Sequence, residues 1–151
     1  MGATIHCYGN KTTYLTGEKL KIYKRIGALI IQNKKILFVG GKDGPADYWT
    51  PGGKVEPGES EEETIKREVA EEVGLEVTKT VFFKEYHSPS PFSNDTEVIS
   101  RTYLVEANGT PKPGNEITRL LWLSLKEAEK YYLTLLDKET LLPDLAKKGL
   151  L

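Results

Sequence analysis

Apolar and polar residues alternate in the first part of the chain in a way that predicts a β-hairpin. Lys21–Gln32 has the composition of a strand and contains an apolar run at Ala28–Ile31 that we expect to be buried. Asn33-Lys34 provides a turn, and Ile36–Gly40 follows as the partner strand. A loop rich in Gly, Pro and Asp, Lys42–Ala46, then ends this part of the chain.

The period of the pattern changes between Ser60 and Gly74, where it predicts an amphipathic helix. Apolar residues recur at helical spacing and form one stripe: Ile65, Val69 and Val73. Ser60 is followed three residues later by Glu63, the spacing of a capping box, in which each side chain bonds the other residue's free backbone N–H. Gly74 stands where a helix ends in a left-handed residue.

The remainder of the chain alternates strands, a loop and helices. Three further strands are predicted: Glu76–His87, Val98–Glu106 and Leu120–Leu123. Ser88–Asp95 is a loop between the first two. Ser124 caps a predicted helix at Leu125–Tyr132, and a last helix runs over Lys138–Lys148, with Pro143 unfavourable in its early part. Strands divided by one central helix and ending in helices predict an α/β fold, with helices on both faces of a mixed sheet.

Composition narrows the classes of protein and partner. With 151 residues, 38% hydrophobic and 28% charged, the chain is expected to form a single folded domain over 1–151. Lys and Arg number 21 against 22 Asp and Glu, so nothing favours a nucleic-acid polymer over a small anionic substrate. The single Cys7 fits a reducing compartment, and the absence of a signal peptide or long apolar run predicts a cytoplasmic protein without a membrane span.

Three glutamates on the central helix form the most distinctive chemical feature. Helical geometry puts Glu68, Glu71 and Glu72 on one arc beside the apolar stripe. Like charges at this spacing cost about 0.2–0.5 kcal/mol per pair, and the last turn of a helix favours cations. A solvated acidic face is the ordinary alternative. A bound divalent cation explains the cluster better, and its hard oxygen ligands select Mg²⁺ or Mn²⁺.

The segment around these glutamates resembles the signature of the Nudix hydrolases at every fixed position. It begins at Gly53, continues through Glu59, and ends in the run Arg67-Glu68-Val69-Ala70-Glu71-Glu72-Val73-Gly74-Leu75. The resemblance implies an α/β/α sandwich that cleaves a nucleoside-linked pyrophosphate with Mg²⁺ or Mn²⁺. It also implies four metal ligands: Glu68, Glu71, Glu72 and the Gly53 carbonyl. Arg67 is expected to pair with Glu59, and Glu68 to polarise the attacking water.

Some members of this family take an additional acidic ligand or base from outside the signature. Glu116 lies in a Pro- and Gly-containing segment just before a predicted strand, where such a residue is often found in the family. Glu97 stands at the start of a strand, where a solvent-facing carboxylate is ordinary. Glu116 is the preferred candidate, and both remain open.

Substrate contacts lie outside the signature and rest on weaker patterns. Trp49 is placed to stack on a base, with Phe92 or Tyr86 as the second wall, although aromatic residues near a core more often pack. Phosphate contacts are expected from Arg25 and Arg101 ahead of Lys42 and Lys54, because strands hold the arginines more rigidly. Pro91 is placed like the proline associated with ADP-ribose hydrolases, although loop prolines are common.

The favoured function is Mg²⁺-dependent hydrolysis of (deoxy)nucleoside triphosphates to a monophosphate and pyrophosphate. ADP-ribose or another sugar nucleotide is the main rival substrate. A nucleotide sensor without turnover would normally have lost signature carboxylates, and this chain keeps them all. An RNA-end enzyme is disfavoured by the missing basic excess. The oligomeric state, a homodimer included, is left open by the sequence.

Overall fold

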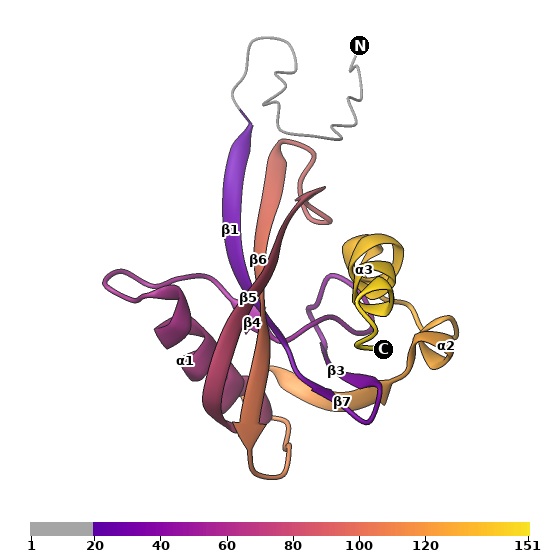
Figure 1. Ribbon diagram of the computed structural model, residues 1–151. Coiled ribbons are helices and arrows are strands. Elements are labelled where there is room, and N and C mark those ends of the chain that lie inside the picture. Colours follow the sequence, from indigo (N-terminus) through magenta and orange to yellow (C-terminus); the bar gives the residue numbers. More distant parts are fainter. Residues whose placement is uncertain (1–19) are drawn as a thin grey trace.

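The computed structural model describes residues 20–151, in which the strands form two sheets (Figure 1). Cys7 lies outside the described residues. The four-stranded sheet has the order β4-β1-β6-β5 and contains both parallel and antiparallel pairs, whereas the three-stranded sheet, β2-β3-β7, is antiparallel. The strand bounds are β1 Lys21–Leu29, β2 Ile31–Gln32, β3 Lys35–Gly41, β4 Gly52–Gly53, β5 Glu76–Pro89, β6 Thr96–Asn108 and β7 Ile117–Leu123.

The strand predicted over Lys21–Gln32 is divided between the two sheets at Ile30. β1 runs parallel to β6 along its whole length, and β2 pairs antiparallel with β3. The Ile30 carbonyl accepts a hydrogen bond from the Leu37 amide at 2.9 Å, so the backbone stays hydrogen-bonded to β3 where the chain passes from one sheet to the other. Asn33 and Lys34 form the predicted turn, with φ of 51° and 61°, the left-handed values that a tight hairpin requires.

β4 is a two-residue strand that the hydrophobic pattern does not predict. Its glycines pair antiparallel with Ile26 and Gly27 of β1. At Gly52, φ is 142°, and a Cβ built there would lie 2.0 Å from the Ile26 carbonyl oxygen. Only glycine therefore allows the chain to approach β1 this closely before it enters the acidic segment.

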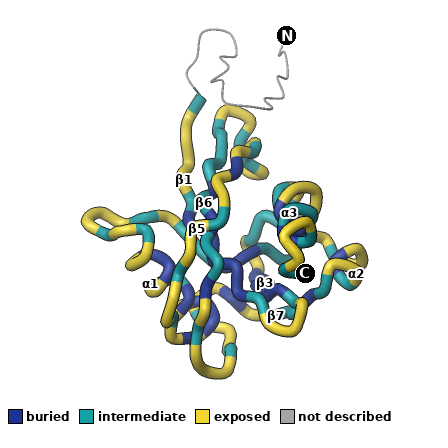
Figure 2. The backbone as a smooth tube through the Cα atoms, viewed as in Figure 1, coloured by how far each residue is buried: buried dark blue, intermediate teal, exposed yellow. Residues whose placement is uncertain are grey.

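The central helix α1, Glu61–Val73, forms as predicted. Ser60 and Glu63 complete the capping box, and Gly74 ends the helix in the left-handed region with φ of 66°. Figure 2 shows that α1 contains buried positions as well as exposed ones. The stripe of Ile65, Val69 and Val73 is buried, and it packs with apolar residues of both sheets, including Ile26, Ala28, Leu37, Val39, Val105 and Ile117. One face of α1 is therefore held by the core.

The helix predicted over Leu125–Tyr132 is shorter than expected. α2 spans only Leu125–Ala128, although its capping box at Ser124 and Glu127 is present. The Tyr132 carbonyl accepts a bond from the Tyr48 amide at 3.3 Å, and Leu133 bridges to Tyr48. This tertiary pairing pulls the following residues into an extended path, which local propensity does not reveal.

The C-terminal helix begins one residue earlier than predicted and has two parts. Asp137–Leu141, labelled η1, has the wider π-helical winding, and α3 continues over Leu142–Lys147. Pro143 has no N–H to donate to the carbonyl four residues earlier, which explains why the regular α-helical pattern starts only beside it. This part of the chain covers the second apolar cluster, which includes Leu29, Ile36, Phe38, Leu123, Leu141, Leu142 and Leu145.

The other strands lie where predicted but extend further at their ends. β5 continues to Pro89 and β6 starts at Thr96, so the loop between them is shorter than Ser88–Asp95. The structure confirms the α/β class, with α1 on one side of the strands and α3 on the other (Figure 1). None of the helices described in residues 20–151 has the length and apolarity to cross a membrane.

The N-terminal cap of α1 gives a direct test of how this helix is held. We expect Ser60→Ala to lower the free energy of unfolding by about 1 kcal/mol, because the Glu63 amide loses its acceptor. Ser60→Asp should restore most of the loss, since Asp also caps helices well. Urea denaturation of the three proteins measures both effects, and equal stability of all three would contradict the role of the cap.

Candidate active site

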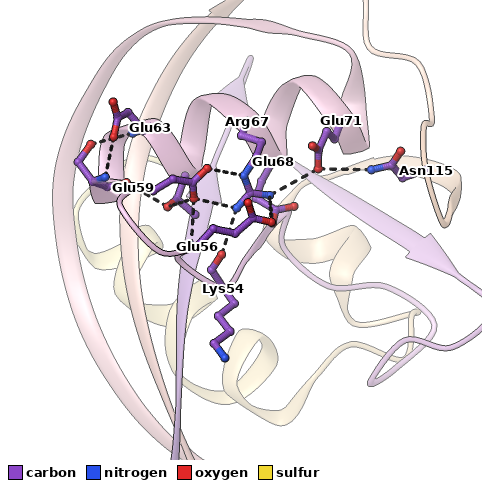
Figure 3. Close-up of polar contacts among 10 residues, drawn as sticks. Lys54, Glu56, Glu59, Glu63, Arg67, Glu68, Glu71 and Asn115 are labelled. Carbon is purple, nitrogen blue, oxygen red and sulfur yellow. Dashed lines mark hydrogen bonds and ion pairs between the residues drawn. The ribbon is translucent and has the colours of Figure 1, made fainter.

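Arg67 and Glu59 form a two-point ion pair between α1 and the loop before it (Figure 3). Arg67 Nε lies 2.6 Å from Glu59 Oε1, and Nη2 lies 3.0 Å from Oε2. Arg67 also donates to the Lys54 carbonyl at 3.1 Å, and Thr64 Oγ1 donates to Glu59 at 2.9 Å. The Arg67 hydrogen bonds, with smaller help from the Glu56 amide and Thr64, lower the pKa of Glu59 from 4.5 to about 2. The loop is thereby fixed to the helix.

The same arginine reaches the carboxylates that follow it on α1. Arg67 Nη1 lies 2.8 Å from Glu68 Oε1 and 3.5 Å from Glu71 Oε2 (Figure 3). Asn115, from the segment before β7, donates to Glu71 at 3.4 Å. Glu71 is exposed, whereas Glu68 is mostly covered. With Glu59, and with Glu56 at 3.9 Å, one guanidinium thus balances four acidic side chains.

Glu72 is the buried member of the acidic set and points to the strand junction. Its side chain is 2% exposed, and Oε1 accepts a hydrogen bond from the Gly52 amide at 2.9 Å. Burial raises the pKa of Glu72 from 4.5 to about 8, against the opposing effects of the Gly52 N–H and the Arg25 charge, and Glu68 raises it further. A carboxylate in this position is costly to ionise unless a positive charge joins it.

Gly53 lies directly against Glu68. A Cβ built at Gly53 would come within 2.2 Å of Glu68 Oε1, so any side chain at this position would displace the carboxylate. Glu68, Glu72 and the two glycines of β4 therefore meet at one place, while Glu71 turns outward to Arg67 and Asn115. Within residues 20–151, no three Asp, Glu, His or Cys side chains surround a common point in the manner of a closed metal cage.

The chemistry of these donors fits a hard divalent cation. Carboxylate oxygens and a backbone carbonyl are the ligands that Mg²⁺ and Mn²⁺ take in proteins, and Mg²⁺ is commonly held by only one or two carboxylates with water and phosphate. Glu72 has a raised pKa because its charge is buried, and a cation would relieve that cost. Glu68 and Glu72 are the side chains best placed for such an ion.

A second feature is a pocket of about 190 Å³ beside α1 that brings together three of the predicted residues. Trp49, Phe92 and Glu116 line it, along with four residues of β3 and the following loop: Gly41, Asp43, Gly44 and Pro45. Gly44 lies flat on the indole, since a Cβ there would be 1.8 Å from Trp49 Cζ3. The sequence marked this loop only by its Gly, Pro and Asp content, which predicts turns and carries no sign of a pocket.

The pocket adjoins the acidic end of α1. The Gly114 amide donates to the Glu72 carbonyl at 3.0 Å, and the Lys112 amide donates to the Val73 carbonyl at 2.9 Å. Glu116 follows Gly114 by two residues, so it stands within about 7 Å of it along the chain. The carboxylates of α1 and the aromatic pocket are thus neighbouring parts of one region.

Arg25 lies beside the acidic region on β1. Its guanidinium donates to the Thr50 hydroxyl at 3.3 Å and to the Thr50 carbonyl, and its charge acts on both Glu72 and the buried Asp137. Asp137 was not among the residues that the sequence suggested. No hydrophobic periodicity or motif in the sequence points to Asp137. Only the tertiary fold brings this residue, at the start of η1, near Arg25.

Three other predicted residues lie elsewhere. Arg101 is bound by Glu61 and Glu85, at 2.8 Å and 2.9 Å, and stacks on the Phe82 ring. Tyr86 is buried in the second apolar cluster and donates to Asp144 at 3.0 Å, so it does not form a wall of the pocket. Glu97 Oε1 lies 2.8 Å from His87 Nδ1 on the neighbouring strand β5. The structure therefore does not bring these three residues to the acidic region.

The fold and the acidic segment together define the class of this chain. The NUDIX domain family profile matches residues 22–145. The chain belongs to the Nudix family. A NUDIX hydrolase from Nitrosomonas europaea has a similar solved structure, with a TM-score of 0.71, 26% identity, and coverage of 86% of this chain and 91% of that one.

Curated relatives carry different named activities. The CTP pyrophosphohydrolase of Escherichia coli is 32% identical over 126 residues, which is 78% of this chain and 87% of the relative. The NAD-capped RNA hydrolase NudC of Deinococcus radiodurans is 26% identical over 134 residues, which is 83% of this chain and 47% of the relative. The chain thus spans about half the length of NudC.

The burial of Glu72 predicts an unusual effect of removing its charge. Without metal at neutral pH, Glu72→Gln should raise the free energy of unfolding, on the order of 1–3 kcal/mol. The amide keeps the bond from Gly52, whereas the Glu72 carboxyl, whose pKa is raised to about 8, must take up a proton when the protein folds at this pH. Thermal unfolding measures this. Added Mg²⁺ or Mn²⁺ should stabilise the wild type but not the variant. If the metal-free variant is less stable than the wild type, burial of Glu72 is not destabilising and the prediction is wrong.

The Glu59–Arg67 pair predicts a stability loss in acid. The pKa of Glu59 is about 2 in the folded protein, below its ordinary value of 4.5, so its contribution is present above about pH 4.5 and disappears as the pH falls toward 2. Unfolding midpoints between pH 6 and pH 3 should fall less steeply for Glu59→Gln than for the wild type. The exposed Glu129→Gln serves as the control and should keep the wild-type slope.

Proposed function

We propose that this protein is a divalent-metal-dependent pyrophosphohydrolase whose preferred substrates are nucleoside triphosphates. The observation that carries the proposal is the meeting of Glu68 and Glu72 with the β4 glycines, next to a pocket with aromatic walls. The match to the CTP pyrophosphohydrolase over most of both chains supports a triphosphate. The match to NudC supports a dinucleotide less, because it covers under half of that protein.

The residues of the acidic region divide the work of a phosphoryl transfer. Glu68 and Glu72, with the Gly53 carbonyl and Glu71, would hold Mg²⁺ or Mn²⁺, which supplies neutralisation of phosphate charge when bound. Glu68 takes the proton from the attacking water. The water oxygen bonds to phosphorus as the bond to the leaving pyrophosphate breaks, which yields a nucleoside monophosphate and pyrophosphate.

The surrounding side chains support this step by position. Arg67 and Glu59 fix the loop and restrict Glu68, the type of contact that orients metal ligands. Arg25 is held by Thr50 beside Glu72, and its charge would attract a substrate phosphate there. Glu116, which lines the pocket, is a further acidic residue of the proposed site.

Substrate hydrolysis tests the proposal directly. Release of monophosphate and pyrophosphate with Mg²⁺ is measured over a panel of nucleoside triphosphates, ADP-ribose, sugar nucleotides, NADH and dinucleoside polyphosphates. We expect pyrophosphate from the triphosphates. Preference for ADP-ribose would overturn the substrate assignment and give weight to Pro91, which precedes Phe92 in the pocket. If no compound of the panel is hydrolysed, a nucleotide sensor without turnover becomes the favoured function.

Glu68→Gln separates chemistry from folding. Turnover should fall by about two to four orders of magnitude, the usual contribution of a general base. The thermal midpoint should change little, because Glu68 is not part of the apolar stripe. Arg67→Ala provides the comparison and should lower both activity and stability, because it loses the Glu59 pair as well. Near-normal rates for Glu68→Gln would contradict its role.

A further inference from the structure

The pocket formed by Trp49, Gly44, Phe92, Asp43 and Glu116 has features that folding does not explain. Phe92 is 71% exposed although it is a large apolar side chain, and it stands on the short loop between β5 and β6. The Phe92 amide bonds to the Ser90 hydroxyl at 3.1 Å, and the Lys21–Asp95 ion pair of 2.9 Å ties the loop to β1. An anchored and solvent-facing aromatic residue opposite a second one is typical of a stacking site.

The size of the pocket suits part of a ligand. Its volume, about 190 Å³, is smaller than the roughly 300–1,000 Å³ of pockets that hold whole drug-sized ligands. One flat ring system is therefore the expected occupant. Gly44 lets the backbone of the loop pack directly against the indole of Trp49, because any side chain at position 44 would collide with the ring. The two aromatic residues provide stacking surfaces for such a ring.

Two carboxylates at the pocket favour a ring that carries hydrogen-bond donors on its edge. Asp43 and Glu116 both line it, and among residues 20–151 neither side chain makes a hydrogen bond or ion pair. An ionised carboxylate only accepts hydrogen bonds. A ring edge with adjacent N–H groups satisfies one of these carboxylates through both oxygens, whereas a ring edge rich in carbonyl groups is repelled.

We propose that this pocket binds the nucleobase and that Asp43 selects bases whose edge presents N–H donors, guanine foremost, against uracil and thymine. Guanine carries N1–H and the exocyclic amino group side by side, which matches the two oxygens of Asp43. Adenine and cytosine offer one amino group beside a ring acceptor. Uracil and thymine offer a single N–H between two carbonyl groups. The inference rests on the proposed function, since the phosphates attached to that base are placed at α1.

The position of the pocket agrees with this assignment. Glu116 lies two residues from Gly114, whose amide is bonded to the last turn of α1, and Asn115 contacts Glu71. A base in the pocket therefore lies next to the segment that contacts the last turn of α1. A nucleoside monophosphate tests the pocket without chemistry, because it has the base and one phosphate but no bond to be cleaved.

The experiment is calorimetric titration of the 151-residue chain with GMP, AMP, CMP and UMP without metal. We expect GMP to bind about tenfold more tightly than UMP, the magnitude of a hydrogen bond to a charged group. Asp43→Asn should abolish or reverse this preference, because an amide presents one acceptor and one donor, which match the O4 and N3–H of uracil. Asp47→Asn, a substitution outside the pocket on the same loop, should leave the preference unchanged.

A second variant tests stacking. Phe92→Ala should raise the dissociation constant of all four nucleotides about 5- to 100-fold, since stacking a base on an aromatic ring is worth about 1–3 kcal/mol. Phe82→Ala, a substitution of an aromatic residue that stacks on Arg101 outside the pocket, should have no such effect. Both changes are at partly exposed positions, so folding is retained.

The outcomes separate this inference from the proposed function. Equal affinity for all four nucleotides, or an unchanged preference in Asp43→Asn, overturns the inference even if triphosphates are hydrolysed. A GMP preference that depends on Asp43 and Phe92 supports it even if hydrolysis of triphosphates is absent, in which case the proposed function alone fails.

Discussion

The hydrogen bond from the Gly52 amide to Glu72 joins the sheet, the loop and the helix at one point. Gly52 pairs with β1 through its backbone and approaches it so closely that only glycine fits. Glu72 brings the acidic face of α1 to this strand, while the adjoining apolar stripe of the same helix is fixed in the core. The acidic region is thus rigid because both of its sides are built into the fold, as preorganised electrostatic sites require.

Arg67 and Arg25 resolve the electrostatic conflict that this arrangement creates. Glutamates crowded near the end of a helix repel one another and oppose the helix dipole. Arg67 contacts Glu59, Glu68 and Glu71 from one side, and Arg25 acts on Glu72 from β1. The two arginines offset most of the repulsion among the glutamates. At Glu72 the effect of burial is larger than that of the Arg25 charge, and the pKa of this carboxyl stays raised.

The acidic helix could be predicted from the sequence because its determinants are local. The spacing of Ile65, Val69 and Val73, the cap at Ser60 and the glycine at 74 all lie within the element that they specify. The α2 boundary, the division at Ile30 and the short strand β4 depend on partners far along the chain, and the local pattern missed them. The same distinction applies to the pocket. Trp49, Phe92 and Glu116 were individual suggestions, and only tertiary packing unites them and adds Asp43 and Gly44.

The division of one strand at Ile30 has a mechanical consequence. β1 and β2 belong to different sheets, and the Ile30 carbonyl is bonded across the junction to Leu37. Just before Ile30, two successive residues of β1 are buried in different apolar clusters, Ala28 with residues of α1 and Leu29 with residues of α3. The two sheets are therefore joined by one continuous stretch of backbone, and we expect them to unfold in a single transition.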